Sequence, residues 1–95
     1  MRRRGRPRKM PVIASPYPEI FYPGPNPVLI TFSELEALRL VDYEDLTQEE
    51  AAKRMNVSRA TVWRLVTSGR KKLVTAILQG RGIRVVPDTY VEGVL

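Results

Sequence analysis

The stretch from residue 47 to residue 67 constrains the fold more than any other part of this sequence. Thr47 is followed three residues later by Glu50, which predicts an N-terminal capping box and a helix of about two turns after it. Asn56 tolerates a left-handed backbone conformation, so it predicts the end of that helix and a tight turn. Ser58 is a second N-cap, so the chain should enter another helix at once.

Small and apolar residues fall on the inner side of both expected helices. Ala51 and Ala52 would let the helices approach closely, and Val57, Val62 and Leu65 would fill the angle between them. Two helices joined in this way form a helix-turn-helix, whose second helix enters the major groove of DNA. The alternative is an ordinary helical hairpin in a small bundle. The common register of caps, turn and small residues favours DNA recognition.

Length and composition exclude several classes of protein. The 95 residues are enough for one small domain, and they contain no cysteine and no histidine. Disulfides, zinc sites of the usual kind and Cys- or His-dependent catalysis are therefore excluded. The sequence has no apolar run that could cross a bilayer and no secretory signal pattern. We expect a non-enzymatic protein of the cytoplasm, associated with the nucleoid, with no catalytic residues, metal, cofactor or membrane partner.

Charge is divided unevenly along the chain. The formal net charge is +6, and residues 1–9 hold six of the 16 basic residues. Residues 34–50 contain seven acidic groups and one basic group, whereas residues 53–84 contain nine basic groups and no acidic one. A basic tail beside a basic half-domain indicates a polyanionic partner.

Residues 1–10 form a basic segment that is expected to be disordered in isolation. Its centre resembles an AT-hook, in which arginines lie along the narrow minor groove of A·T-rich DNA. The predicted minor-groove contacts are Arg3, Arg4, Gly5, Arg6, Pro7 and Arg8. The alternative is a generic basic tail that binds phosphates without sequence preference.

Residues 11–30 are interpreted as an extended Pro-rich arm. Seven of the eight prolines precede residue 28, which disfavours helix and central strand. The apolar Ile13, Tyr17 and Phe21 are expected to pack on the helical domain or on a second subunit, and a plain linker is the alternative. Val28–Ile30 forms a short β-like run at the end of the arm.

The first helix is expected to begin at Ser33, which forms a capping box with Glu36, and to continue to about Tyr43. Phe32 would act as a hydrophobic staple toward Ala37. Acidic residues along this segment are interpreted as a solvated face: Glu34, Glu36, Asp42, Glu44 and Asp45.

The recognition helix should run from Arg59 to about Gln79, with a kink near Gly69, and end at Gly80. Ile83–Val86 is strand-like and would pair with the run at 28–30 or with another subunit. The expected fold is mainly α: a helix-turn-helix domain of three to four helices at 31–80. The extended N-terminal arm precedes it, and a short strand and C-terminal tail follow at 81–95.

Several of these segments together resemble a known family. They are the Arg-Gly-Arg-Pro-Arg-Lys start, the Pro-rich segment, the run Glu34 to Asp42, and the motifs from Thr47 to Ala52 and from Met55 to Arg59. The chain is similar to the small prokaryotic proteins of domain-of-unknown-function family 134, which are predicted to bind DNA. Its helical part also resembles region four of bacterial sigma factors. Asn56 stands where glycine is common, and Trp63 occupies an outward position that is usually polar.

These considerations assign roles to individual side chains of the expected interface. The predicted contacts to DNA bases are Arg59, Thr61, Trp63 and Arg64. The predicted contacts to phosphates are Ser58, Lys53, Arg54, Thr67, Arg70, Lys71 and Lys72. For Trp63, contact with a protein partner or with the core is an equal alternative.

The sequence therefore predicts a sequence-specific double-stranded DNA-binding protein, a transcriptional regulator. Homodimerisation is expected through apolar Leu73, Ile77 and the Pro-rich arm. Two alternatives remain open. One is a sigma-like adaptor that binds RNA polymerase through the acidic helix, and the other is an RNA-binding protein that stacks bases on Trp63.

Overall fold

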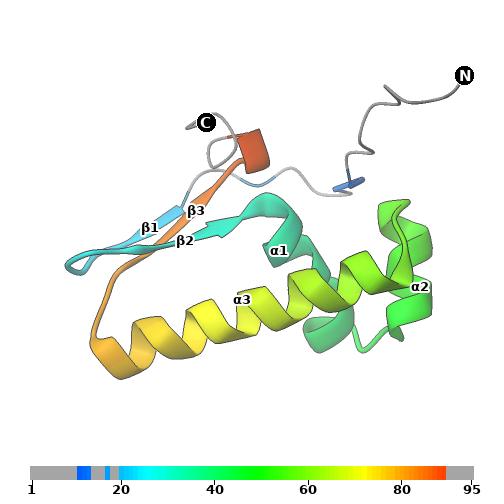
Figure 1. Cartoon of the computed structure of the whole chain (residues 1–95). Coiled ribbons are helices and arrows are strands. Elements are labelled where there is room, and N and C mark those ends of the chain that lie inside the picture. Colours follow the sequence, from blue (N-terminus) through cyan, green and yellow to red (C-terminus); the bar gives the residue numbers. More distant parts are fainter. Residues whose placement is uncertain (1–10, 14–16, 18–19, 90–95) are drawn as a thin grey trace, which may run out of the picture.

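The computed structural model describes residues 11–13, 17 and 20–89 and contains three α-helices, a short π-helical segment and a three-stranded sheet (Figure 1). The fold is mainly α, as predicted. In chain order the elements are β1 (Ile20–Tyr22), β2 (Val28–Thr31), α1 (Phe32–Leu38), η1 (Arg39–Tyr43), α2 (Gln48–Met55), α3 (Arg59–Gln79) and β3 (Ile83–Val86).

The sheet has the order β1-β3-β2, so the last strand of the chain lies in its middle. β3 runs parallel to β2, with Ile30 opposite Val85, and antiparallel to β1, with Ile20 opposite the same residue. The predicted pairing of the β-like runs at 28–30 and 83–86 is confirmed and occurs within one chain. Strand β1 was not predicted. The sheet therefore joins the segments expected to be an arm and a tail.

The start of α1 differs from the prediction. The N-cap is Thr31, whose hydroxyl accepts from the Glu34 N–H at 3.1 Å while the Glu34 carboxylate accepts from the Thr31 N–H at 2.9 Å. The cap lies two residues earlier because β2 extends through Thr31, which pairs with Val86. The capping box of Ser33 with Glu36 is therefore wrong.

Ser33 has another role, since its backbone N–H and its hydroxyl both donate to the carboxylate of Asp88. The predicted staple is also wrong, because Phe32 is the first residue of the helix. Its ring instead lies 5.9 Å from the ring of Tyr17, centroid to centroid. These contacts tie the residues after β3 and the N-terminal arm to the start of α1.

The helix that begins with α1 continues to Tyr43 as predicted, but its last part is wider. The N–H of Glu44 donates to the carbonyl of Arg39 at 2.8 Å, five residues back, which defines the π-helical segment η1. Leu40, at its second position, is fully buried.

The hydrophobic core lies where α1, η1, α2 and α3 meet. The residues predicted to bring α2 and α3 together, Ala51 and Ala52, are buried, and Val57 and Leu65 pack against the core from its edge. The buried members of this core are Ala37, Leu38, Leu40, Ala51, Ala52, Met55, Val62 and Val66.

Helix α3 runs through Gly69 without interruption, as 21 residues of α-helix. Gly69 is buried, and a Cβ added to it would lie 2.8 Å from Cδ1 of Leu38. The glycine thus allows α1 to approach α3 closely. Gly80 ends the helix in a left-handed conformation, as predicted. None of the helices in the part of the chain that the structure describes is long and apolar enough to cross a membrane.

Candidate nucleic-acid interface

The turn between α2 and α3 is held by the residues that the sequence indicated. Thr47 and Glu50 form the predicted capping box at the start of α2. Asn56 has φ 56° and ψ 46°, and its N–H donates to the carbonyl of Lys53 while the next N–H donates to that of Ala52. Ser58 then caps α3 by accepting the N–H of Thr61 at 3.0 Å. Only three residues, Asn56, Val57 and Ser58, separate the two helices.

Buried side chains fix α2 against α3. Met55 near the end of α2 and Val62 and Val66 of α3 are fully buried. α2 stands steeply across the N-terminal end of α3, and the sheet and α1 lie along the same side of α3 (Figure 1). The first turns of α3 therefore keep one long face directed outward.

The predicted base-contacting residues lie on this face. Arg59, Trp63 and Arg64 are exposed, and Trp63 has 51% of its surface accessible. Its alternative role as a core residue is therefore wrong. Thr61 is half-buried, and its hydroxyl lies 2.9 Å from that of Ser58 and 3.5 Å from Nη2 of Arg64. Thr61 thus belongs to the cap as much as to the outer surface.

The predicted phosphate contacts fall into two groups. Five of them are exposed and form no ion pair within the described ranges: Lys53, Arg54, Ser58, Thr67 and Lys71. The other two are bound to carboxylates of the same chain. Arg70 donates two hydrogen bonds to Asp42, at 2.6 and 3.0 Å, and Lys72 lies 2.9 Å from Glu34.

The carboxylate that binds Lys72 is buried. Glu34 is 5% exposed, and its side chain also accepts from the hydroxyl of Ser68 at 2.5 Å. Burial disfavours the charged form, but the hydrogen bonds from Ser68 and Lys72 outweigh it and hold the pKa of Glu34 below its usual value. The hydrogen bonds from Arg70 likewise lower the pKa of Asp42.

Glu36 is only 1% exposed and lies in a second network. It accepts from the Tyr17 hydroxyl at 2.6 Å and pairs with Arg39 at 2.9 Å. Burial and the bond to Glu36 raise the pKa of Tyr17 to about 12, and the same carboxylate raises the pKa of Arg39. The prediction of a solvated acidic face is therefore wrong for Glu34 and Glu36. Sequence reasoning treated the acidic run as uniform and missed its inward-facing members.

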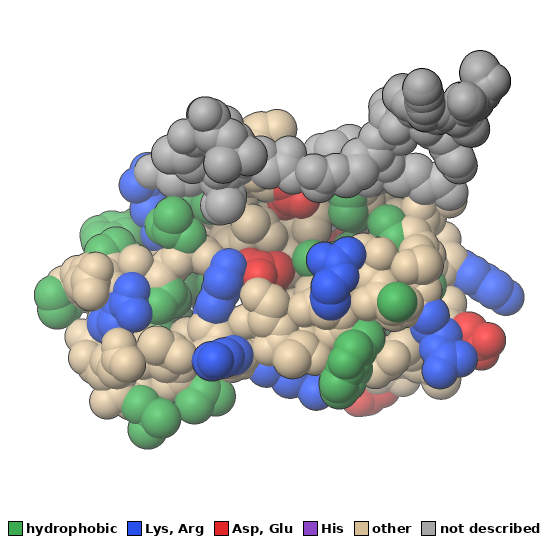
Figure 2. All heavy atoms as spheres, in the orientation of Figure 1, with side chains coloured by type: hydrophobic (Ala, Val, Ile, Leu, Met, Phe, Trp, Pro, Cys, Tyr) green, Lys and Arg blue, Asp and Glu red, His purple; other side chains and the backbone are tan. Residues whose placement is uncertain are grey.

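Two flanks can be distinguished along the exposed surface of α3. The basic flank consists of Arg64, Ser68, Lys71 and Thr75, which are spaced four, three and four residues apart and so share one side. Neither of its two cations forms an ion pair in the part of the chain that the structure describes. Lys and Arg side chains lie at intervals across the face that α3 presents in Figure 2.

The apolar flank lies on the side of α3 next to η1. It consists of Val74 and Ile77 of α3 with Tyr43 of η1, all of which are more than half exposed. Trp63 lies on the same side but nearer the start of α3, among the predicted base contacts. Arg70 lies on this side, where its pairing with Asp42 neutralises it. The apolar flank thus carries little net charge.

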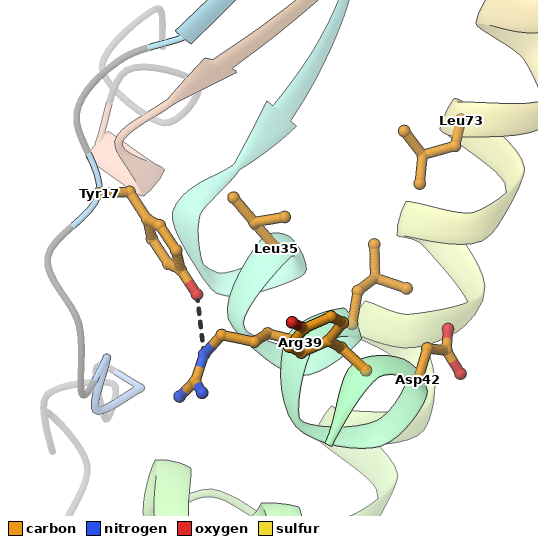
Figure 3. Close-up of a pocket in the computed structure, with 7 residues that line it drawn as sticks. Tyr17, Leu35, Arg39, Asp42 and Leu73 are labelled. Atoms are coloured by element: carbon orange, nitrogen blue, oxygen red, sulfur yellow. Dashed lines mark hydrogen bonds between the residues drawn. The ribbon is translucent and has the colours of Figure 1, made fainter. Parts of the chain in front are cut away.

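A pocket of about 440 Å³ opens beside the apolar flank (Figure 3). Leu35 and Leu73 form part of its wall, and the labelled Arg39 and Asp42 stand at its edge. Tyr17 closes another side, with its hydroxyl accepting from Nε of Arg39 at 3.2 Å. The charged groups around this pocket are already bound to partners within the chain, so the pocket is chiefly an apolar hollow.

The N-terminal arm is fixed next to the helix-turn-helix. The N–H of Val12 donates to the carbonyl of Met55 at 2.8 Å, at the C-terminal end of α2. The segment with the predicted minor-groove contacts therefore joins the domain beside the turn. Those residues themselves, Arg3, Arg4, Gly5, Arg6, Pro7 and Arg8, lie outside the described residues.

These features define a class: small, mainly α proteins in which a helix-turn-helix is backed by a short sheet. Within that class, the chain belongs to the family described as protein of unknown function DUF134, whose model matches residues 1–91.

Its relatives come from archaea and bacteria. A UPF0251 protein of Pyrococcus furiosus is 53% identical over 93 residues, covering 90% of this chain and 86% of that protein. A UPF0251 protein of Thermococcus kodakarensis is 56% identical over 70 residues, covering 74% and 61%. One from Clostridium beijerinckii is 46% identical over 63 residues, covering 66% of this chain and 43% of that protein. No solved structure gave a significant match.

Proposed function

We propose that this protein binds double-stranded DNA in a sequence-specific manner and regulates transcription, in the cytoplasm and on the nucleoid. In this proposal the N-terminal half of α3 lies in the major groove, where a helix fits and where base edges differ between all four base pairs. Arg59, Trp63 and Arg64 face the bases, and Lys53 and Arg54 of α2 face the phosphates.

The observation that carries the proposal is the position of Arg64. It is exposed on the outer side of a helix whose start is fixed by Ser58, and it has no carboxylate partner within the described residues. An unpaired arginine on such a helix is suited to bind O6 and N7 of guanine, the commonest specific contact in protein–DNA complexes.

The test is selection of bound sequences from random duplexes by the full chain, followed by affinity measurements with Arg64→Ala. We expect one sequence class to be enriched. On that site the substitution should cost about 1–3 kcal/mol of binding free energy, and on random DNA it should cost little. The matched control is Lys53→Ala, which should weaken binding about equally on both kinds of DNA because a phosphate contact carries no sequence information.

Each possible failure has a separate meaning. If Arg64→Ala loses the same binding free energy on selected and on random DNA, Arg64 contacts only phosphates. An absence of enrichment would overturn sequence-specific binding. Structured RNA that competes as well as the selected duplex would favour the RNA-binding alternative, and capture of RNA polymerase that survives nuclease and high salt would favour the adaptor.

We also propose a homodimer that forms through the apolar flank. A second copy would bring the same uncharged surface, so both copies could bury apolar area without leaving a charge unpaired. Ile77 is 76% exposed, and Leu73 beside it lines the pocket next to Tyr43. Dimerisation there leaves the basic flank on the other side of α3 free for DNA.

A further inference from the structure

A second hollow, of about 510 Å³, lies on the other side of α3, between that helix and the start of β2 with Pro27 before it. Ser68, Lys71, Lys72 and Thr75 line it from α3, and Arg81 lines it from the loop after the helix. Two hydroxyl groups and three cations thus surround one groove. No role for Thr75 or Arg81 could be inferred from the sequence, because the fold alone brings the loop after α3 next to Thr75.

The charges in this groove are not equivalent. Lys72 is bound to the buried carboxylate of Glu34, so this pair contributes little net charge. Lys71 is exposed and forms no ion pair among the described residues. Arg81 likewise has no carboxylate partner there. The groove therefore carries two uncompensated positive charges.

Arg81 is held in place by the neighbouring backbone. Its Nε donates to the carbonyl of Asn26 at 2.6 Å, and Nη1 donates to the Gln79 side chain at 3.3 Å. The loop that carries it packs tightly, because a Cβ on Gly82 would lie 2.8 Å from the Tyr22 carbonyl oxygen. Nη2 of Arg81 makes no hydrogen bond to the described residues, so a donor remains available at a fixed place.

The spacing of the basic flank fits the width of a DNA groove. Lys71 lies seven residues after Arg64, which places it about 10 Å further along the helix axis on the same side. The major groove is about 12 Å wide and is bordered by phosphates. When Arg64 reaches a base edge, Lys71 and the protein groove behind it therefore lie next to the phosphates that border the major groove of the DNA.

We infer that the groove formed by Lys71, Thr75 and Arg81 binds a backbone phosphate of duplex DNA. The inference rests on the proposed function and extends it, because it adds a contact from the far end of α3 and the loop before β3. It also separates three consecutive basic residues that look alike in the sequence. Lys71 contacts DNA, whereas Arg70 and Lys72 serve to hold α3 against η1 and α1.

The test is the salt dependence of affinity for the selected duplex, measured with wild type, Lys71→Gln, Arg81→Gln and Arg70→Gln. Each phosphate contact contributes close to one unit to the slope of log affinity against log salt concentration. We expect either Lys71→Gln or Arg81→Gln to reduce the slope by about one unit, and the double variant to reduce it no further, because both cations hold the same phosphate. Arg70→Gln is the matched control, and it should leave the slope unchanged because its charge is already compensated.

Lys71→Arg keeps the charge and should keep the wild-type slope. Thermal unfolding of each variant shows whether a change in affinity comes from a lost DNA contact or from a less stable fold. Ethylation of DNA phosphates should interfere with wild-type binding at a position where it no longer affects Lys71→Gln.

If wild type binds the duplex but Lys71→Gln and Arg81→Gln keep its slope, the groove does not hold a phosphate. If wild type selects no duplex at all, the proposed function itself fails. Inorganic phosphate distinguishes a DNA phosphate from free phosphate as the ligand of this groove. If it releases the protein from the duplex only at the concentrations at which other salts do so, the groove is not a free-phosphate site. Release at a much lower phosphate concentration would overturn the assignment to DNA.

Discussion

The two flanks of α3 belong to one helix but differ in how their charges are compensated. On the apolar flank, the exposed Arg70 is bound to Asp42 of η1, and the surrounding surface is apolar. On the basic flank, Arg64 and Lys71 lack ion pairs among the described residues. The carboxylate that Ser68 of this flank contacts is the buried Glu34, which is bound to Lys72. The lesson is that the number of basic residues along a helix does not define its binding face. The distribution of carboxylates on the packed neighbours decides which cations remain available.

The largest expected effect concerns the apolar flank. Ile77→Asp should weaken the proposed homodimer by about 1.5–3 kcal/mol, because an apolar side chain that is buried on association becomes charged. Analytical ultracentrifugation over a range of concentrations measures the dissociation constant. The matched control is Leu78→Asp, since Leu78 is 79% exposed and lies seven residues after Lys71, on the same side of α3 as the basic flank. Equal effects of the two substitutions, or a monomeric wild type, would contradict the assignment of this flank.

A smaller effect is expected at the ion pair under the basic flank. Glu34→Gln should reduce the free energy of unfolding by about 1–3 kcal/mol, because it leaves the donors on Ser68, Lys72 and the Thr31 backbone poorly satisfied. Denaturant unfolding measures the change. A free energy of unfolding of Glu34→Gln equal to that of wild type would show that this network does not hold α1 against α3.

The same network should make stability depend on pH in the acid range. Because folding lowers the pKa of Glu34 below its ordinary value of 4.5, the stabilisation is fully present above that pH. It is lost as the pH falls through the lowered pKa. Stability curves between pH 2 and pH 6 should therefore be flatter for Glu34→Gln than for wild type. A curve for Glu34→Gln that is as steep as that of wild type would assign the acid sensitivity to other carboxylates.

The smallest effect is expected for the ion pair on the apolar flank. Asp42→Asn should change the free energy of unfolding by at most about 1 kcal/mol, because both partners are exposed by 40% or more. It would also release the charge of Arg70. If the salt dependence of DNA binding then becomes steeper, Arg70 contacts a DNA phosphate once Asp42 no longer binds it. That result would contradict the inference that only the basic flank contacts DNA.

The helix-turn-helix could be predicted from the sequence because its determinants are local. The caps at Thr47 and Ser58 and the left-handed Asn56 act within a few residues, and each lies where the pattern indicated. The same holds for Gly80 at the end of α3. Caps and turns of this kind depend little on the rest of the fold.

The parts that could not be predicted depend on contacts between distant segments. Thr31 and Ser33 both begin a capping-box pattern, and the choice between them was made by the pairing of β2 with β3 and by Asp88. The burial of Glu34 depends on Lys72, 38 residues away in the sequence. Strand β1 is only three residues long, and its pairing with β3 gives no periodic pattern. For the candidate interface, the sequence indicated which residues of α3 face outward. It did not indicate which of their charges are compensated, because the partner carboxylates come from α1 and η1.

The hydrogen bond from Val12 to Met55 has a consequence for the basic segment that precedes it. It holds Val12 at the end of α2, and α3 begins four residues after Met55. Ten residues at full extension reach about 35 Å, or some ten base pairs of DNA. On a duplex already held by α3, the arginines near the N-terminus would therefore act at a high effective concentration over that short distance only. Even a weak preference for A·T pairs would then be read beside the main site, and the length of the tether would set how far away it can be.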